Sequence, residues 1–544
     1  MTRTAQLPLV LLLLALAATV AAYFPGLSGP LLTDDIPQLK RLIDNSADAP
    51  AALIDAHLMS TGGQFGRPVA MATFIADAIV HGPDIWWWKF SNLVIHLLTG
   101  LLVFWLSGLL IVATGQRTSR GPWLPAAAVA AVWLLHPLQV STVLYTVQRM
   151  TELSALFVLA GLICYVRGRQ LQETAAGKGW MLIAAGFLLC FPLAVLSKES
   201  ALLFPAFCTL IELIVFRFDA AAQLRQKIRA LHGVLLFGYV SATAYVAANF
   251  SSYVLNAYAV RDFTLFERLL TETRVLLLYI AQLLRPIQSK MGFFHDDLVI
   301  STGLLSPVST LISMLVLAAL LASAVALRKK LPLYAFGILF FFTAHALESA
   351  FFALELMFEH RNYLASFGIF IALMALAQQL ISAQRAKMAV VAVGLLALSF
   401  LTYQRTVTWA SPASMYDFMY YAHPKSPRLS FILADLHAEV GEFDRSRQLL
   451  GNIAPGLATG MYVLYLDCLE HKRLEANAID LVRRIPDGKA DGHVIANTKL
   501  LFEAVQAQRC TAPDAAMAAL LQHLLTLPIR HRLDTQALRK LMPG

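Results

Sequence analysis

Long apolar runs alternate with short polar segments over the first 400 residues of the chain. Runs such as 7–23, 85–113 and 305–327 approach or exceed the roughly 20 residues that a helix needs to cross a bilayer. We predict about eleven spanning helices, at 7–23, 86–113, 123–136, 151–166, 180–196, 201–216, 232–249, 305–327, 332–347, 364–382 and 388–403. The expected fold is therefore an all-α, polytopic membrane domain over residues 1–403. The first run could instead be a cleaved signal peptide.

Two segments between the predicted spans are too long and too polar to be simple connectors. The first external loop, residues 24–85, contains helix-like stretches and is expected to fold as a cap. The second, residues 250–304, contains an amphipathic stretch at 263–285 that ends in an apolar run. We expect this stretch to be an interfacial or re-entrant helix, because the basic loop at 328–330 leaves no place for another crossing.

The tail from residue 404 to 544 is polar, and its apolar residues recur at helical spacing. Phe443, Leu450 and Pro455 recur 31 residues later as Leu474, Leu481 and Pro486. A period of about this length is typical of tetratricopeptide-like pairs of antiparallel helices. The tail is predicted to be a helical repeat-like domain, and a generic helical domain is the alternative.

The composition supports the interpretation as a membrane protein, and the distribution of charge predicts the orientation of the protein in the membrane. The 544 residues are 58% hydrophobic and 14% charged, with a mean hydropathy of +0.63. The short loops after alternate spans hold 15 cations against two acids, Glu173 and Asp219. Such basic loops face the cytoplasm, so the formal charge of +9 reflects topology and not nucleic-acid binding. We expect an integral membrane protein, in a bacterial inner membrane, with its N-terminus cytoplasmic and its C-terminal domain periplasmic.

The five cysteines show no metal-ligand spacing. Cys164, Cys190 and Cys208 lie in predicted spans, whereas Cys468 and Cys510 lie in the polar tail. The last two could form a disulfide in an oxidising compartment or remain two free thiols.

Ionisable residues in and near the spans are costly unless they have partners or line a cavity, so their positions indicate a site. On the predicted topology they gather at the outer ends of the helices. The candidates are Asp34, Asp35, Arg67, His136, Gln148, Arg149, Lys198, Glu199, Glu359, His360, Arg361, Asn362 and Tyr363. The alternative for each cluster is an ion pair that holds two helix ends together.

Asp34 and Asp35 follow the first span directly. Asp35 precedes Pro37 by two residues, which is ordinary N-capping chemistry. An acidic pair at the border between lipid and water could also act as a general base on a hydroxyl group. Arg361 and Arg149 would then supply positive charge to a phosphate leaving group. The pair could hold a divalent metal, although the sequence shows no clear third ligand.

These motifs, in this order, resemble those of the GT-C class of polytopic glycosyltransferases. The chain is most similar to bacterial relatives of the transmembrane and tetratricopeptide repeat-containing O-mannosyltransferases. The residues that carry the resemblance are Thr33-Asp34-Asp35, Gly66-Arg67-Pro68, Asn92 with His96, His136-Pro137, Gln148-Arg149, Ser197-Lys198-Glu199 and Glu359-His360-Arg361-Asn362-Tyr363.

The resemblance implies transfer of a sugar from a polyprenyl-phosphate donor to a protein or surface glycan on the periplasmic face. It implies Asp34 or Asp35 as the catalytic base, and Arg361, Lys198, Arg149 and His360 as donor-phosphate ligands. Two alternatives remain at this stage: an O-oligosaccharyltransferase or ligase that moves a preassembled glycan, and a non-enzymatic scaffold or transporter. The sequence contains no Gly-rich nucleotide-phosphate loop, which argues against direct use of a nucleotide sugar.

Overall fold

The structure is a computed structural model that describes residues 3–44, 66–116, 121–258, 261–485, 492–527, 538–539 and 541. Its regular elements are helices, as the apolar periodicity predicts. Arg117 and Arg120 of the first basic loop, and Pro486 of the proposed repeat, lie outside the described residues.

The chain forms two compact units. Unit 1 comprises Met1–Ala248, Glu267–Phe293 and Ser301–Phe418. Unit 2 comprises Asn249–Phe266, Phe294–Ile300 and Met419–Gly544. Two segments of the predicted 250–304 loop therefore belong to the same unit as the C-terminal tail.

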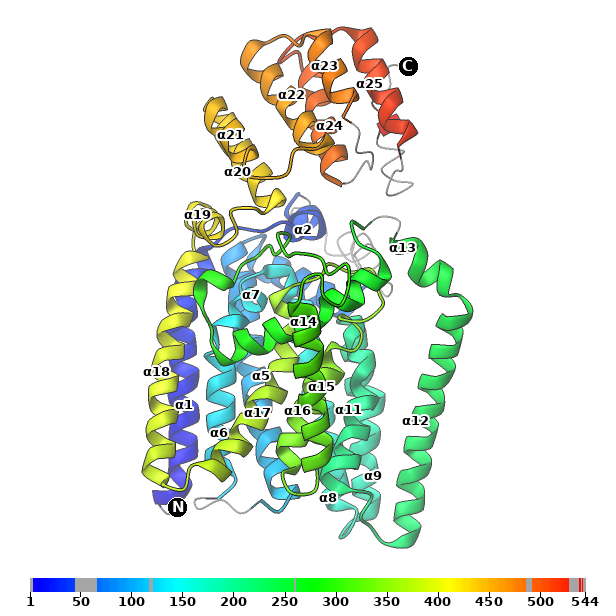
Figure 1. The fold of residues 1–544 in the computed structure, drawn as a ribbon. Coiled ribbons are helices and arrows are strands. Elements are labelled where there is room, and N and C mark those ends of the chain that lie inside the picture. Colours follow the sequence, from blue (N-terminus) through cyan, green and yellow to red (C-terminus); the bar gives the residue numbers. More distant parts are fainter. Residues whose placement is uncertain are drawn as a thin grey trace. The chain divides into compact units, whose positions relative to one another are not determined.

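Unit 1 is a helix bundle in which successive long helices run in alternating directions (Figure 1). Its long elements are α1 (Arg3–Tyr23), α5 (Ile85–Ala113), α6 (Trp123–Leu134), α8 (Arg149–Leu171), α9 (Ala176–Ala185), α10 (Phe191–Val195), α11 (Phe204–Ile211), α12 (Ala222–Ala248), α15 (Ser309–Leu327), α16 (Pro332–His345), α17 (Asn362–Leu380) and α18 (Gln384–Thr408). A π-helical turn, η4 (Gly186–Cys190), joins α9 to α10, and a second, η6 (Glu212–Phe216), extends α11.

Nine helices are long and apolar enough to cross a bilayer, among the residues that the structure describes. A tenth span arises if Trp123–Leu134 and Pro137–Val143, which meet at 48°, are counted as one bent crossing. The bend falls at Pro137, whose ring cannot continue a helix. The predicted count of eleven is thus too high by this criterion. The remaining segment, α16, has 14 residues and spans about 21 Å, less than the roughly 30 Å hydrocarbon core.

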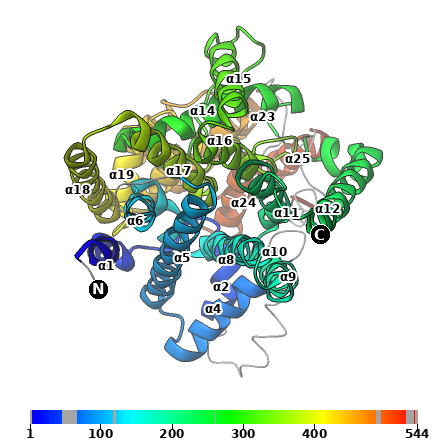
Figure 2. The ribbon, with the colours of Figure 1, turned by 90° about the horizontal axis from the view of Figure 1, so that it is seen from below.

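The middle of unit 1 is formed by helices that are largely buried, and its border by helices whose apolar side chains are exposed. Viewed along the bundle, α5, α8, α16 and α17 lie inside, while α12, α15 and α18 lie at the edge (Figure 2). Gly337 of α16 and Gly368 of α17 face each other so closely that a Cβ on Gly337 would lie 2.2 Å from the Gly368 carbonyl oxygen. Small residues at such positions let two helices approach in a membrane.

Shorter helices gather at one end of this bundle, which we call the Asp34 end. They include α2 (Asp35–Asp44), α4 (Pro68–His81), α7 (Val140–Val143) and α14 (Leu265–Leu284). As predicted, α14 is not among the candidate spans. The end of the bundle at which α5, α8, α15 and α17 finish is the opposite end.

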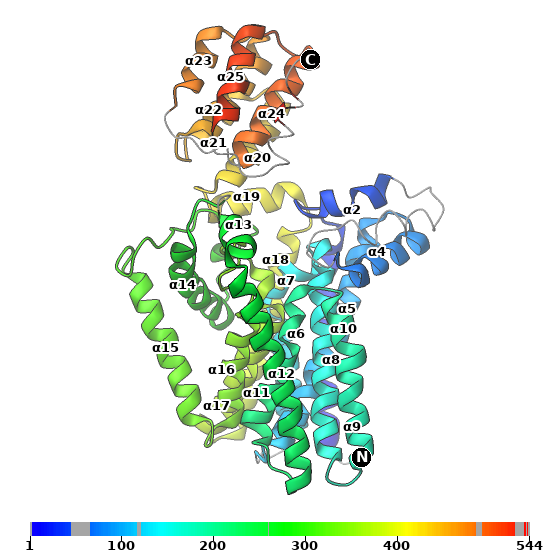
Figure 3. The same cartoon turned by 90° about the vertical axis from the view of Figure 1, so that its right-hand side faces the viewer.

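In the described part of unit 2, six helices follow residue 426: α20 (Pro427–Glu439), α21 (Phe443–Leu450), α22 (Leu457–His471), α23 (Ala476–Arg483), α24 (Gly492–Gln506) and α25 (Asp514–Thr526) (Figure 3). Cys468 and Cys510 form a disulfide, with their Cα atoms 5.4 Å apart. The predicted repeat is not regular, because Leu450 is 3% exposed whereas its counterpart Leu481 is 68% exposed. The structure thus establishes a helical domain, and the tetratricopeptide-like interpretation stays a prediction.

Candidate functional site

Asp34 and Asp35 occupy different environments. Asp35 is fully buried, and its two carboxylate oxygens accept hydrogen bonds from the backbone N–H groups of Val147 (2.6 Å) and Leu32 (2.8 Å). It therefore joins the segment after α1 to the turn before α8, and these bonds are not those of an N-cap. Burial raises the pKa of Asp35 to about 7, even though both amides and nearby Lys89 lower it. Asp34 is exposed, so its carboxylate is accessible from solvent.

Tyr145 connects this acidic pair to the second group of candidates. Its hydroxyl accepts a hydrogen bond from the Asp34 backbone N–H (3.1 Å) and lies 3.2 Å from the Thr33 hydroxyl. On the other side, the Tyr145 ring lies 6.4 Å from the His360 ring, centroid to centroid. Tyr145 is not among the predicted site residues, since a lone tyrosine between spans carries no distinguishing pattern.

Lys198, His360 and Arg361 line one small pocket together with Glu348. Lys198 Nζ lies 2.8 Å from Glu348 Oε1, and Arg361 Nε lies 4.0 Å from Glu348 Oε2. Burial alone would raise the pKa of Glu348, but Lys198 and Arg361 outweigh it and lower the pKa to about 2. The pocket has a volume of about 30 Å³. That is the room of about one water molecule, so an incoming anion must displace the Glu348 carboxylate.

Helix α14 fixes the loop that carries Glu348. The guanidinium of Arg268 donates hydrogen bonds to the backbone carbonyls of Glu348 (2.7 Å), Ala350 (2.9 Å) and Leu354 (2.6 Å). Tyr279 donates to the Phe358 carbonyl (2.9 Å), and its hydroxyl accepts from the Phe358 N–H (2.8 Å). The loop between α16 and α17 is therefore positioned by a helix that is not among the candidate spans.

Arg149 does not line the pocket of Lys198 and Arg361. It is fully buried, lies 2.7 Å from Asp77 and donates to the Asn92 side chain (2.7 Å) and to the Trp88 carbonyl (2.7 Å). These bonds hold α4, α5 and α8 together. Arg149 thus has a structural role, and it could contact a phosphate directly only if its bonds to Asp77, Asn92 and Trp88 were broken.

Two further candidates form ion pairs between helix ends. Arg67, just before α4, lies 3.0 Å from Glu199, just before α11. Glu359 is buried, accepts from the Gly292 N–H (2.9 Å) and pairs with Arg405 of α18. Arg405 is not among the predicted site residues, because it lies within an apolar helix far from Glu359 in the chain.

The remaining predicted residues make hydrogen bonds that order the helix ends. His136 accepts from the Leu138 N–H (3.2 Å) and bonds the Leu283 carbonyl (3.2 Å). Gln148 accepts from Thr151 (2.7 Å), and Asn362 donates to the Glu359 carbonyl (3.3 Å). Tyr363 bonds His96 through the hydroxyl (2.9 Å). All four are buried and none of them lines the pocket of Lys198 and Arg361, so their roles in a reaction stay predictions.

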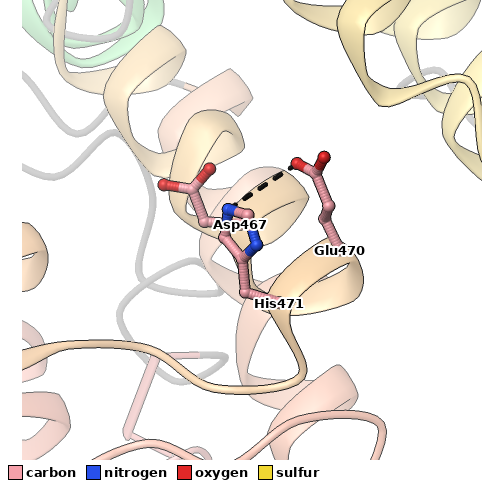
Figure 4. A group of neighbouring side chains, drawn as sticks. All are labelled: Asp467, Glu470 and His471. Carbon is pink, nitrogen blue, oxygen red and sulfur yellow. Dashed lines mark ion pairs between the residues drawn. The ribbon is translucent and has the colours of Figure 1, made fainter.

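A divalent metal does not fit the Asp34 and Asp35 pair. Asp35 uses both oxygens on backbone amides, and within the described ranges no third ligand joins the pair. The group whose ligand atoms do lie close together is Asp467, Glu470 and His471 in unit 2 (Figure 4). Arg447 pairs with both Asp467 (2.9 Å) and Glu470, so a side-chain cation already balances these carboxylates.

Comparison of the chain with protein-family models, with curated proteins and with solved structures finds no match. By its helices the chain is a polytopic α-helical membrane protein, with nine to ten candidate spans in the part that the structure describes.

Proposed function

We propose that this protein is a membrane glycosyltransferase that transfers a sugar from a polyprenyl-phosphate-linked donor to a protein or surface-glycan acceptor. The observation that carries the proposal is the convergence of an exposed acid and a cationic pocket at the Asp34 end. Tyr145 lies between them, next to Asp34 on one side and to His360 on the other. The resemblance to GT-C glycosyltransferases likewise implies an acidic residue as the catalytic base and basic residues as ligands of the donor phosphate.

In this mechanism Asp34 is the catalytic base. Its carboxylate takes the proton of the acceptor hydroxyl, and the hydroxyl oxygen attacks the anomeric carbon of the sugar. The bond from that carbon to the phosphate oxygen breaks, and the lipid phosphate leaves with the electron pair. Asp35, with both oxygens held by backbone amides, positions the loop that carries Asp34.

Lys198 and Arg361 would bind the departing phosphate. Each now interacts with Glu348, and charge-assisted contacts to a phosphate are among the strongest polar interactions in proteins. A lipid donor reaches a pocket at the ends of spanning helices by lateral movement in the bilayer, with its anionic group at the interface. The donor phosphate would replace the Glu348 carboxylate between the two cations.

The proposed orientation places the Asp34 end in the periplasm. The loops at the opposite end are basic, as is typical of the cytoplasmic side. Helix α18 returns the chain to the Asp34 end, and the Cys468–Cys510 disulfide beyond it favours an oxidising compartment. In this scheme the tetratricopeptide-like helices would present or select the acceptor.

The test compares envelope glycoproteins and glycans of cells with and without the protein, by mass spectrometry. We expect a glycan that is lost with the protein and restored by the wild type. Asp34→Asn should lower transfer about 100-fold or more, the usual contribution of a general base, while the variant still inserts. The exposed Asp417→Asn variant, at a carboxylate outside the site, is the matched control.

Full transfer by both Asp34→Asn and Asp35→Asn would overturn the proposal. The mass of the lost glycan distinguishes transfer of one sugar from transfer of a preassembled chain.

A further inference from the structure

A second polar cavity lies at the opposite end of the bundle, away from the site above. It has a volume of about 890 Å³ and is bordered by the ends of α5, α8 and η6 and the beginnings of α12 and α16. Four arginines line it, Arg169, Arg217, Arg225 and Arg229, against two acids, Glu173 and Asp219.

The four arginines differ in how their charges are balanced. Arg169 is buried and pairs with Glu212, so it belongs to the framework. Within the described residues, Arg217 forms no ion pair and donates to the backbone carbonyls of Arg328 and Lys329, at 3.4 and 3.3 Å. These bonds keep its full charge and place it beside another basic turn.

The remaining two arginines lie one helical turn apart at the beginning of α12. Arg225 donates to the Ala220 carbonyl (3.0 Å), which leaves its charge unneutralised, and it reaches the Asp219 carboxylate only at 4.0 Å. Arg229 has no ion-pair partner among the described residues of unit 1. Both side chains are accessible at the cavity, and no close carboxylate among the described residues neutralises either charge, so the cavity favours an oxygen-rich anion.

A rigid framework holds the cavity open. Glu212 of η6 accepts from Arg169 and from the Tyr165 hydroxyl (2.8 Å), which also bonds His232 of α12 (2.8 Å). Arg169 additionally donates to the Asp219 carbonyl (3.4 Å). The turn that it holds contains two consecutive left-handed residues, Arg217 (φ 56°) and Phe218 (φ 55°), a conformation that residues with a Cβ rarely adopt.

We propose that this cavity binds the phosphate headgroup of an anionic phospholipid. Its polar part offers three incompletely balanced arginines, and arginine binds phosphate oxygens through paired N–H donors. Its wall also contains apolar residues at helix ends, including Val112, which is 52% exposed on the outside of α5. A phospholipid would place its phosphate against the arginines and its acyl chains against the apolar residues at the helix ends. Basic pockets between spanning helices are known to bind such headgroups. The site is independent of the proposed transferase reaction.

The test measures binding of dioleoyl phosphatidylglycerol to the full-length protein in neutral detergent by native mass spectrometry. The double variant Arg225→Gln with Arg229→Gln should bind about thirtyfold more weakly. Asp219→Asn should bind about fivefold more tightly, a gain that misfolding cannot imitate. Arg385→Gln removes an exposed charge at the beginning of α18, outside the cavity, and should bind as the wild type does.

Three results would overturn the proposal. Equal binding of dioleoyl phosphatidylcholine would show that charge is not recognised. Displacement of the lipid by millimolar inorganic phosphate would assign the cavity to a free anion. An equal loss in Arg385→Gln would show general attraction to basic loops and no defined site.

Discussion

Glu348 provides the sharpest test of the cationic pocket, because its pKa reports the strength of the ion pairs directly. Folding lowers the pKa from 4.5 to about 2, through Lys198 and Arg361 acting against burial. A change of this size corresponds to about 3 kcal/mol of stability at pH 7, at 1.36 kcal/mol for each pH unit. The side chain is only 14% exposed, so solvent screening reduces this value little.

The direction of the pH dependence follows from the lowered pKa. The stabilising contribution is complete above about pH 4.5, where the carboxyl group is ionised in both the folded and the unfolded chain. It falls as the pH drops toward 2, and at pH 3 about half remains. Glu348→Gln should therefore lower stability by about 3 kcal/mol at pH 7 and by about half as much at pH 3.

The assay is reversible unfolding of the purified protein in mixed micelles with increasing SDS, at the two pH values. Asp417→Asn, at an exposed carboxylate, is the control and should change stability by less than about 0.5 kcal/mol. If Glu348→Gln costs under about 1 kcal/mol, or costs the same at both pH values, the pair behaves as a surface salt bridge and the reasoning is refuted.

Three further perturbations test the packing. Cys468→Ala opens a disulfide with a sequence separation of 42 residues, and should cost about 4 kcal/mol, seen as faster proteolysis of the C-terminal helices; an unchanged rate would contradict this. Arg405→Gln leaves Glu359 as an unpaired buried charge, and should cost about 3–5 kcal/mol in SDS unfolding, a prediction that a wild-type midpoint would exclude. Gly337→Ala should cost about 1–3 kcal/mol by separating α16 from α17, whereas Gly394→Ala, which meets open space, should not; equal effects would rule out the close approach.

The membrane fold follows from the sequence itself. A helix satisfies its backbone hydrogen bonds internally, so a long apolar run is sufficient to predict a span without knowledge of its neighbours. The structure confirms nine of the predicted spans as long apolar helices. The predicted count of eleven exceeds this number at α16, which has only 14 residues, and the predicted span at 123–136 counts only if the helix pair bent at Pro137 is one crossing.

The sequence also predicts that the candidate residues lie at helix ends on one side of the membrane. Successive spans run in opposite directions, so every second loop lies on the same side. It could not decide which side chains meet. Arg149 was grouped with Lys198 and Arg361, yet Arg149 pairs with Asp77 while the other two share Glu348. A charged side chain at a helix end can reach several oppositely charged side chains. The rotation of each helix about its axis determines which of them it pairs with.

Tertiary structure alone also separated the two neighbouring aspartates. Asp35 turns inward to two backbone amides, and Asp34 stays in solvent. Whether a segment enters the membrane depends on the summed hydrophobicity of about 20 consecutive residues, which can be read from the sequence. Orientation and pairing depend on single contacts between segments far apart in the chain, such as Tyr145 beside His360. The sequence by itself thus determined the helices and their alternation, and the packed bundle decided which residues form a site.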